Sequence, residues 1–134
     1  MKSAIEHTLS PHIGDTHLFV RFDVPRSVIA DNTAHAILRI IRELVSNAIN
    51  HGKARTVKIA GSCDGRHIMF SVKDDGCGFD PGTVPGMRQG HFGLPGIRER
   101  IRKFNGTIDI DSSPGAGTKV SISLERPQKE GKRK

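Results

Sequence analysis

The chain has 134 residues, a formal net charge of +7, 35% apolar residues, and neither Trp nor Tyr. This length supports one domain with an aliphatic core, and no apolar run reaches the ~20 residues that cross a bilayer or resembles a secretion signal, so we expect a cytoplasmic domain that makes no membrane contact of its own. Some of the positive charge belongs to a polar C-terminal tail, and elsewhere the basic residues are dispersed apart from a group on one predicted helix. No aromatic residues are interleaved with them to stack on bases, so nucleic acid is not an expected partner.

The first regular element is predicted to begin at residue 17, after a short N-terminal segment. Residues 1–16 contain Pro11 and Gly14, which interrupt any regular pattern, so we expect a linker or the remnant of a preceding helix that adds nothing to the core. Residues 17–24 combine β-branched and aromatic side chains and are predicted to form a strand that ends at Pro25.

A long amphipathic helix is predicted over residues 34–51. Residues 31–33, Asp-Asn-Thr, offer N-cap side chains, and Gly52 follows the last turn. The apolar residues recur at helical spacing and predict a buried face; they are Ile37, Ile41, Leu44, Val45, Ala48 and Ile49.

This helix also carries a polar stripe beside its apolar face. Glu43, Asn47 and His51 recur at i, i+4 and i+8, with Asn50 next to them. A carboxylate, an amide and an imidazole at the rim of a core can hold a hydrated cation or a polar ligand partly out of water. A solvated helix edge is the alternative interpretation.

Two strands are predicted over residues 56–61 and 66–73, joined by an Asp64-Gly65 turn of the kind found in hairpins. The two cysteines, Cys63 and Cys77, lie in different segments without metal-ligand spacing. They therefore predict neither a disulfide framework nor a zinc site.

The second of these strands runs into an Asp-x-Gly-x-Gly segment at residues 74–78. Glycines at Gly76 and Gly78 let the backbone approach a ligand closely, and the Asp74 carboxylate can accept a hydrogen bond from an amino group. An ordinary turn is the alternative, because Asp-Gly pairs are common there.

A glycine-rich loop is predicted over residues 80–93, and it leads into a helix over residues 94–104. A loop of this length in a compact domain is typical of a lid or a binding loop. A glycine-rich loop entering a helix N-terminus suits phosphate, because free amide groups and the helix dipole both favour an anion. A flexible surface loop without a ligand is the alternative.

The chain ends with two predicted strands and a tail. Residues 107–111 and 119–124 flank a turn-forming segment and predict an antiparallel pair. Residues 126–134 are polar and basic and are predicted to be disordered. The hairpin and this pair together predict an α+β fold, a two-layer α/β sandwich whose mixed, mostly antiparallel sheet of about five strands is covered by helices on one face.

In order, these motifs resemble the N, G1 and G2 boxes and the terminal Gly-Thr of the superfamily shared by gyrase, heat-shock chaperone, histidine kinase and mismatch-repair ATPases. The matching segments are residues 43–47, 74–78, 93–94 and 117–118. Within this superfamily, residues 90–124 resemble the C-terminal half of a sensor histidine kinase, notably the subclass partnered with nitrate-response-type regulators. The resemblance covers residues 17–125 and implies the GHKL, or Bergerat, ATPase fold with ATP and Mg²⁺ as ligands.

The resemblance implies roles at the phosphate end of the nucleotide. Asn47 would be the metal ligand. Glu43 would be the catalytic residue, which holds a metal-bound water or polarises the site near the γ-phosphate. Family members often carry a basic residue three positions after the metal-binding Asn, where this chain has Asn50. The positive charge could come instead from Arg88 in the predicted lid.

The resemblance also implies roles for residues around the adenine ring and in the lid. Asp74 would accept from the adenine amino group, and Thr118 would support that end through water. The other residues implied to bind ATP are Asn50, His51, Gly76, Gly78, Arg88, Gly90, Gly93 and Leu94.

A histidine kinase also needs a phosphoacceptor His on a dimerising helical hairpin, and the residues before the first predicted strand are too few to form one. We therefore expect a catalytic domain over residues 17–125 that acts on a separate acceptor hairpin and, through it, on a response regulator. Two alternatives stay open. One is an anti-sigma-factor serine kinase, because Asn47 to Gly52 resembles its Asn-x-x-x-His-Gly segment; the other is a non-catalytic module that changes shape with nucleotide.

Overall fold

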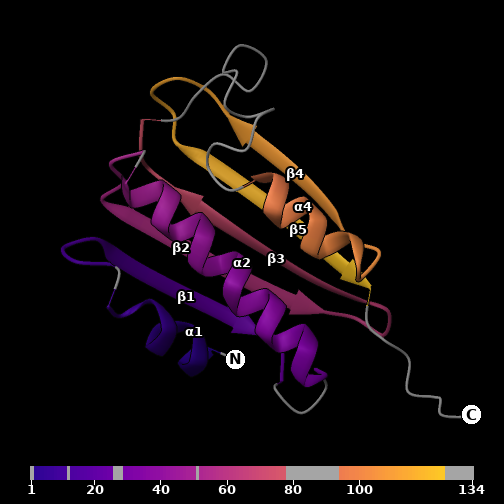
Figure 1. Cartoon of the computed structure of the whole chain (residues 1–134). Helices are drawn as coiled ribbons and strands as arrows, with labels where there is room; N and C mark the ends of the chain where they lie inside the picture. The colour runs from indigo at the N-terminus through magenta and orange to yellow at the C-terminus, as the bar shows by residue number, and fades with distance from the viewer. Residues whose placement is uncertain (1, 12, 26–28, 51, 78–93, 126–134) are drawn as a thin grey trace, which may run out of the picture.

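A computed structural model describes residues 2–11, 13–25, 29–50, 52–77 and 94–125 (Figure 1). The elements in chain order are α1 (Lys2–Leu9), β1 (His17–Asp23), α2 (Asp31–Asn50), β2 (Thr56–Cys63), β3 (His67–Asp74), α4 (Leu94–Arg102), β4 (Thr107–Ser112) and β5 (Thr118–Glu125). The strands form a single five-stranded sheet in the order β1-β2-β3-β5-β4.

The sheet is mixed, as the sequence predicts. β1 pairs with β2 in parallel, because α2 carries the chain back across the sheet between them. The other three pairings are antiparallel. At the β2–β3 turn the Asp64 carboxylate accepts from the amides of Arg66 and His67, both at 2.7 Å.

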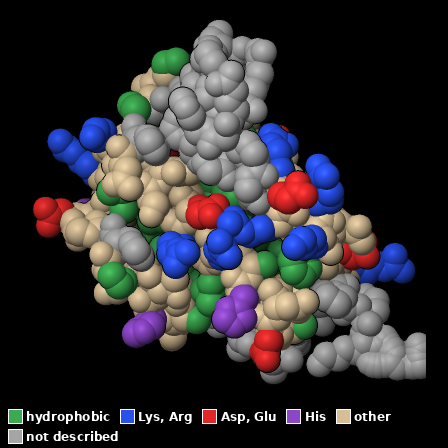
Figure 2. All heavy atoms as spheres, viewed as in Figure 1, with side chains coloured by type: hydrophobic (Ala, Val, Ile, Leu, Met, Phe, Trp, Pro, Cys, Tyr) green, Lys and Arg blue, Asp and Glu red, His purple; other side chains and the backbone are tan. Residues whose placement is uncertain are grey.

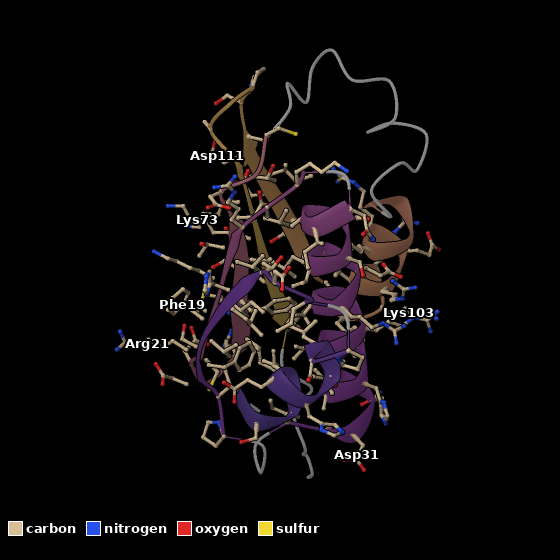
Figure 3. The ribbon with its side chains drawn as sticks, turned by 90° about the vertical axis from the view of Figure 1, so that its left-hand side faces the viewer. Phe19, Arg21, Asp31, Lys73, Lys103 and Asp111 are labelled. Atoms are coloured by element: carbon tan, nitrogen blue, oxygen red, sulfur yellow. The ribbon has the colours of Figure 1, made fainter. Side chains whose placement is uncertain are left out.

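All described helices cover one face of the sheet (Figures 1 and 3). The predicted two-layer sandwich is therefore confirmed. The α2 helix begins at Asp31, so the three residues expected to cap it belong to its first turn. Its buried face consists of Thr33, Ala34, Ile37, Ile40, Ile41, Leu44, Val45 and Ala48. In the described part of the chain, no helix is both long enough and apolar enough to span a membrane.

The N-terminal helix differs from expectation. Residues 1–16 were predicted to add nothing to the core, yet Ile5 and Leu9 of α1 are fully buried. The helix ends before Pro11, and its two apolar residues stand four positions apart, so both side chains face the same way. They pack in the contact of α1 with α2 and β1. The expectation was wrong because Pro11 limits the length of the helix without preventing its burial.

The opposite face of the sheet carries a row of lysines. Figure 3 shows Phe19, Arg21, Lys73 and Asp111 projecting from the side of the sheet away from the helices. On this face the register places Lys73 beside Lys58 of β2 and beside Lys119 of β5. All three lysines are exposed, and none forms an ion pair within the described ranges. Like charges directly opposite each other on neighbouring strands repel and destabilise a sheet.

Replacing the central lysine should therefore stabilise the fold. We expect Lys73→Thr to raise the free energy of unfolding by about 0.5 kcal/mol, because it removes two repulsive neighbours and a β-branched residue suits a strand. Lys119→Thr is the matched control. Lys119 also faces Asp111 of β4, so this substitution removes an attractive interaction as well as a repulsive one. Urea denaturation should show the larger gain for Lys73→Thr, and the difference should shrink in high salt. Equal gains at both positions would contradict this interpretation.

Candidate functional site

The polar stripe of α2 lies at the edge of its contact with α4. Glu43 and Asn47 are half-buried, one helical turn apart. The Glu43 carboxylate accepts a hydrogen bond from Arg100 of α4, with 2.8 Å between Oε2 and Nη1. Asn50 is the last residue of α2 and is exposed. The described stripe residues Glu43 and Asn47 thus lie at the rim of the core, and the Glu43 side chain points toward α4.

The C-terminal end of α2 is tied by backbone contacts to the end of β3. The amide of Gly52 donates to the carbonyl of Asn47 at 3.1 Å, and the carbonyl of Gly52 accepts from the amide of Cys77 at 2.8 Å. A Cβ atom on Gly76 would collide with the Gly52 carbonyl oxygen. Gly76 is therefore required for the close approach of two backbone segments, whatever it does toward a ligand.

Asp74 is the last residue of β3 and is half-buried. Its Oδ1 accepts from the amide of Gly76 at 2.8 Å. The pKa of Asp74 is raised, mainly because burial disfavours the charged carboxylate. Hydrogen bonds from the amides of Gly76 and Thr118 lower this pKa, and the nearby charge of Asp75 raises it further. A carboxylate partly removed from water gains more from an incoming N–H donor than an exposed one does.

The start of β5 lies next to Asp74, because Asp74 and Thr118 are partners in the β3–β5 register. The hydroxyl of Thr118 is 2.9 Å from the hydroxyl of Ser112, which also donates to the carbonyl of Gly117 at 3.0 Å. Gly117 has φ +76°, and a Cβ there would meet the carbonyl oxygen of Asp74. Ser112 did not stand out in the sequence, because only the β4–β5 pairing places it beside Thr118.

Asp75 has a role that the sequence did not reveal. Its Oδ1 accepts from the amides of Arg55 at 2.8 Å and Thr56 at 2.9 Å, which joins the start of β2 to the end of β3. These hydrogen bonds, with that of Thr56 contributing most, lower the pKa of the Asp75 carboxyl. Nothing in the sequence relates position 75 to position 55, because the contact depends on the register of β2 and β3.

The structure brings together part of the predicted site. Asp74, Gly76 and Thr118 meet at one end of the sheet, and the backbone contacts of Gly52 place the end of α2 beside them. Leu94 is the first residue of α4, where only the backbone is described. The remaining predicted residues lie outside the described residues; they are His51, Gly78, Arg88, Gly90 and Gly93.

The described side chains supply too few ligands to hold a metal ion by themselves, so they suit an ion that arrives bound to a ligand. No group of three or more His, Cys, Asp or Glu side chains could hold an ion within the part of the chain that the structure describes. Asn47 offers one amide oxygen, a suitable ligand for a hard cation. Because Mg²⁺ keeps several waters and commonly takes phosphate oxygens as ligands, one amide fits an ion carried by a nucleotide and does not fit an all-protein cage.

Comparison with known proteins identifies the family. Residues 32–128 match the model of the histidine kinase-, DNA gyrase B-, and HSP90-like ATPases. The chain belongs to this family.

Several relatives are sensor kinases. Sensor histidine kinase YdfH of Bacillus subtilis is 33% identical over 126 residues, which cover 92% of this chain and 31% of that protein. Nitrate/nitrite sensor protein NarQ of Escherichia coli is 39% identical over 98 residues, covering 70% of this chain and 16% of NarQ. The chain thus spans less than a third of the length of these curated relatives.

Solved structures share the fold. The ATP binding domain of PrrB from Mycobacterium tuberculosis superposes with a TM-score of 0.77 at 18% identity, covering 95% of this chain and 92% of that one. A blue-light activated histidine kinase from Erythrobacter litoralis superposes with a TM-score of 0.75 at 22% identity, covering 98% of this chain and 41% of that one. The predicted Bergerat-type fold is confirmed.

The contacts of Asp75 predict a pH-dependent contribution to stability. Because folding lowers its pKa, Asp75 stabilises the fold above its unfolded-state pKa of about 3.9, and this contribution is lost as the pH falls through the folded-state pKa. Asp75→Asn should therefore be less stable than the wild type at about pH 7, and the difference should close on acidification.

Urea denaturation at a series of pH values measures this difference. Asp109→Asn is a suitable control, because Asp109 is exposed on β4 and its side chain makes no hydrogen bond or ion pair within the described ranges. A gap between wild type and Asp75→Asn that stayed constant down to about pH 3 would show that the carboxylate charge is not what matters.

Proposed function

We propose that this chain is the ATP-binding catalytic domain of a sensor histidine kinase. It binds Mg-ATP and transfers the γ-phosphate to a His on a separate dimerisation and phosphoacceptor hairpin, which then phosphorylates a response regulator. The observation that carries this proposal is the convergence of a half-buried carboxylate, Asp74, with the C-terminal end of the Glu43–Asn47 stripe at one end of the sheet. Because ATP is supplied inside the cell, the proposal includes a cytoplasmic location.

The adenine end of the site is assigned to the end of β3. Asp74 accepts a hydrogen bond from the exocyclic amino group, a donor that matches a carboxylate. The amide of Gly76 already donates to Oδ1, which fixes the orientation of the carboxylate before the base arrives. Thr118 stands beside Asp74 across the β3–β5 pair, where its hydroxyl can hold a bridging water.

The phosphate end is assigned to α2 and to the segment before α4. Asn47 holds the Mg²⁺ ion, which supplies positive charge to the phosphate oxygens when bound. Glu43 acts on the attacking nucleophile. The further residues proposed for the phosphates, the pocket wall and the lid are Asn50, His51, Gly78, Arg88, Gly90, Gly93 and Leu94.

The names of the relatives support a kinase that acts on a partner. They include the signal transduction histidine-protein kinase/phosphatases UhpB of Salmonella typhimurium, 32% identical, and DegS of Bacillus subtilis, 33% identical. NarQ is one sensor protein among several, so the nitrate-response subclass is the finer part of the proposal. A serine kinase of the same superfamily is the second candidate, favoured only by the Asn47 to Gly52 segment.

Mutations should separate the contact to the adenine ring from the contact to the metal ion. Asp74→Asn places an amide where the adenine amino group needs an acceptor, so we expect Mg-ATP affinity to fall by about 1–3 kcal/mol. Asn47→Ala should remove chiefly the part of the affinity that depends on magnesium. Titration calorimetry with and without Mg²⁺ separates these effects. If Asn47→Ala bound Mg-ATP as tightly as the wild type, the metal assignment would be wrong.

Phosphoryl transfer should require a supplied acceptor. With γ-labelled ATP, the chain alone should stay essentially unlabelled, because transfer depends on holding a nucleophile in line with the γ-phosphate. A purified acceptor hairpin with a single His should become labelled, and the same hairpin with His→Gln should not. Glu43→Gln should lower the transfer rate by more than it lowers ATP affinity.

The nature of the label distinguishes the candidate functions. Phosphohistidine is acid-labile, so an acid-stable label on a serine-bearing partner would favour the serine kinase. ATP binding without transfer to any partner would favour a non-catalytic module. Strong acid-labile labelling of the chain alone, for instance on His7, would show an internal acceptor and would contradict the proposed arrangement.

A further inference from the structure

Arg100 makes an ion pair that differs from its neighbours. Its Nη1 lies 2.8 Å from Oε2 of Glu43, and the two side chains are only 23% and 29% exposed. Two residues further along α4, Arg102 lies 3.9 Å from Glu99, with the side chains 77% and 69% exposed. The second pair stays within one helix, whereas the first joins α4 to α2. Of these two ion pairs, the one between Arg100 and Glu43 is therefore shorter, more sheltered from water and formed between two helices.

A contact of this kind holds a flexible side chain in one place. Glutamate has three side-chain torsions, and an exposed carboxylate on a helix samples many of their combinations. A charge-assisted hydrogen bond that is partly removed from water is strong enough to select one of them. Because Glu43 is one turn before Asn47 on α2, the position of Arg100 decides where this carboxylate stands relative to the proposed metal ligand.

The surrounding charges do not provide an equivalent contact. Figure 2 shows Lys and Arg side chains gathered over α2 and α4, with acidic side chains among them. The exposed basic residues of these helices and the turn after α4 are Arg39, Arg42, Arg98, Arg102 and Lys103. Exposed charges are screened by salt and keep their rotational freedom. Arg100, by contrast, is half-buried and lies against Glu43.

We propose that Arg100 is a positioning residue that holds the Glu43 carboxylate for phosphoryl transfer. This inference rests on the proposed kinase function. In the step itself, one ring nitrogen of the acceptor His bonds to the γ-phosphorus, and the bond to the bridging oxygen breaks with its electron pair going to ADP. Glu43 receives the proton of the other ring nitrogen. Arg100 contacts neither substrate; it acts only through the place it gives to Glu43.

The test compares variants of the full chain in single-turnover assays. Labelled Mg-ATP and the purified acceptor hairpin are present, and loss of the γ-phosphate is counted as phosphohistidine plus free phosphate. Arg100→Gln should lower this rate constant by about tenfold or more, because a misplaced general base loses much of its effect. The Kd for Mg-ATP should change by less than about threefold, since the carboxylate acts mainly in the transition state. Arg100→Lys keeps the charge and one donor, and it should recover part of the rate.

Two controls separate positioning from a loss of structure. Arg102→Gln removes the exposed pair on the same helix and should leave the rate unchanged. The double variant Glu43→Gln with Arg100→Gln should be no slower than Glu43→Gln alone, because Arg100 has nothing left to position. Thermal unfolding of each variant establishes that it is folded at the assay temperature. A purely structural Arg100 would give additive losses in the double variant.

The outcomes also separate this inference from the function on which it rests. If the wild-type chain did not label the acceptor hairpin, the proposed kinase function would fall, and the inference with it. If the wild type labelled the hairpin no faster than Glu43→Gln did, the role of Glu43 and the inference would fall while the kinase function stood. If the wild type were active and Arg100→Gln were equally active, only the inference would fail. A higher rate constant for Arg100→Gln than for the wild type would also overturn the inference, because it would show that the ion pair withholds Glu43 from the reaction.

Discussion

The burial of one face of α2 against the sheet is the constraint on which the rest of this structure depends. Residues from Thr33 to Ala48 fill the space between helix and sheet, and this burial supplies the main driving force for folding. It also fixes the rotation of the helix about its axis. Glu43 and Asn47 consequently stand at the rim of the core, where polar groups are neither fully hydrated nor unreachable by a ligand.

The end of the sheet is held together mostly by backbone groups. The Gly52 carbonyl accepts from the Cys77 amide, the Gly115 amide donates to the Cys77 carbonyl, and the Asp75 carboxylate accepts from two amides at the start of β2. Such contacts tolerate little displacement, because neither Gly76 nor Gly117 has room for a side chain. The result is a preorganised end of the sheet around Asp74, and preorganisation of this kind lowers the entropic cost of binding for any ligand.

Charge is distributed unequally over the two faces. The helix face carries many arginines, and among the described residues of its helices Glu43, bound by Arg100, is the sheltered carboxylate. The open face of the sheet carries the Lys58, Lys73 and Lys119 row without ion-pair partners in the described part of the chain. Residues 126–134, with five basic residues and one acidic residue, account for +4 of the +7 net charge. On the two described faces, local pairing rather than net charge decides whether a charged side chain stabilises the fold.

The sequence by itself determined the fold class, most element positions and the pairing of the hairpin, because periodicity and turn residues act over short distances. It also selected Glu43, Asn47 and Asp74 as candidate site residues. The tertiary structure decided what depends on contacts between distant segments. It buries α1 through Ile5 and Leu9, and it brings the Asp75 carboxylate to the amides at the start of β2. It also places Ser112 beside Thr118 and Arg100 beside Glu43. These contacts join residues that only strand register or helix packing brings together, and no local pattern in the chain encodes them.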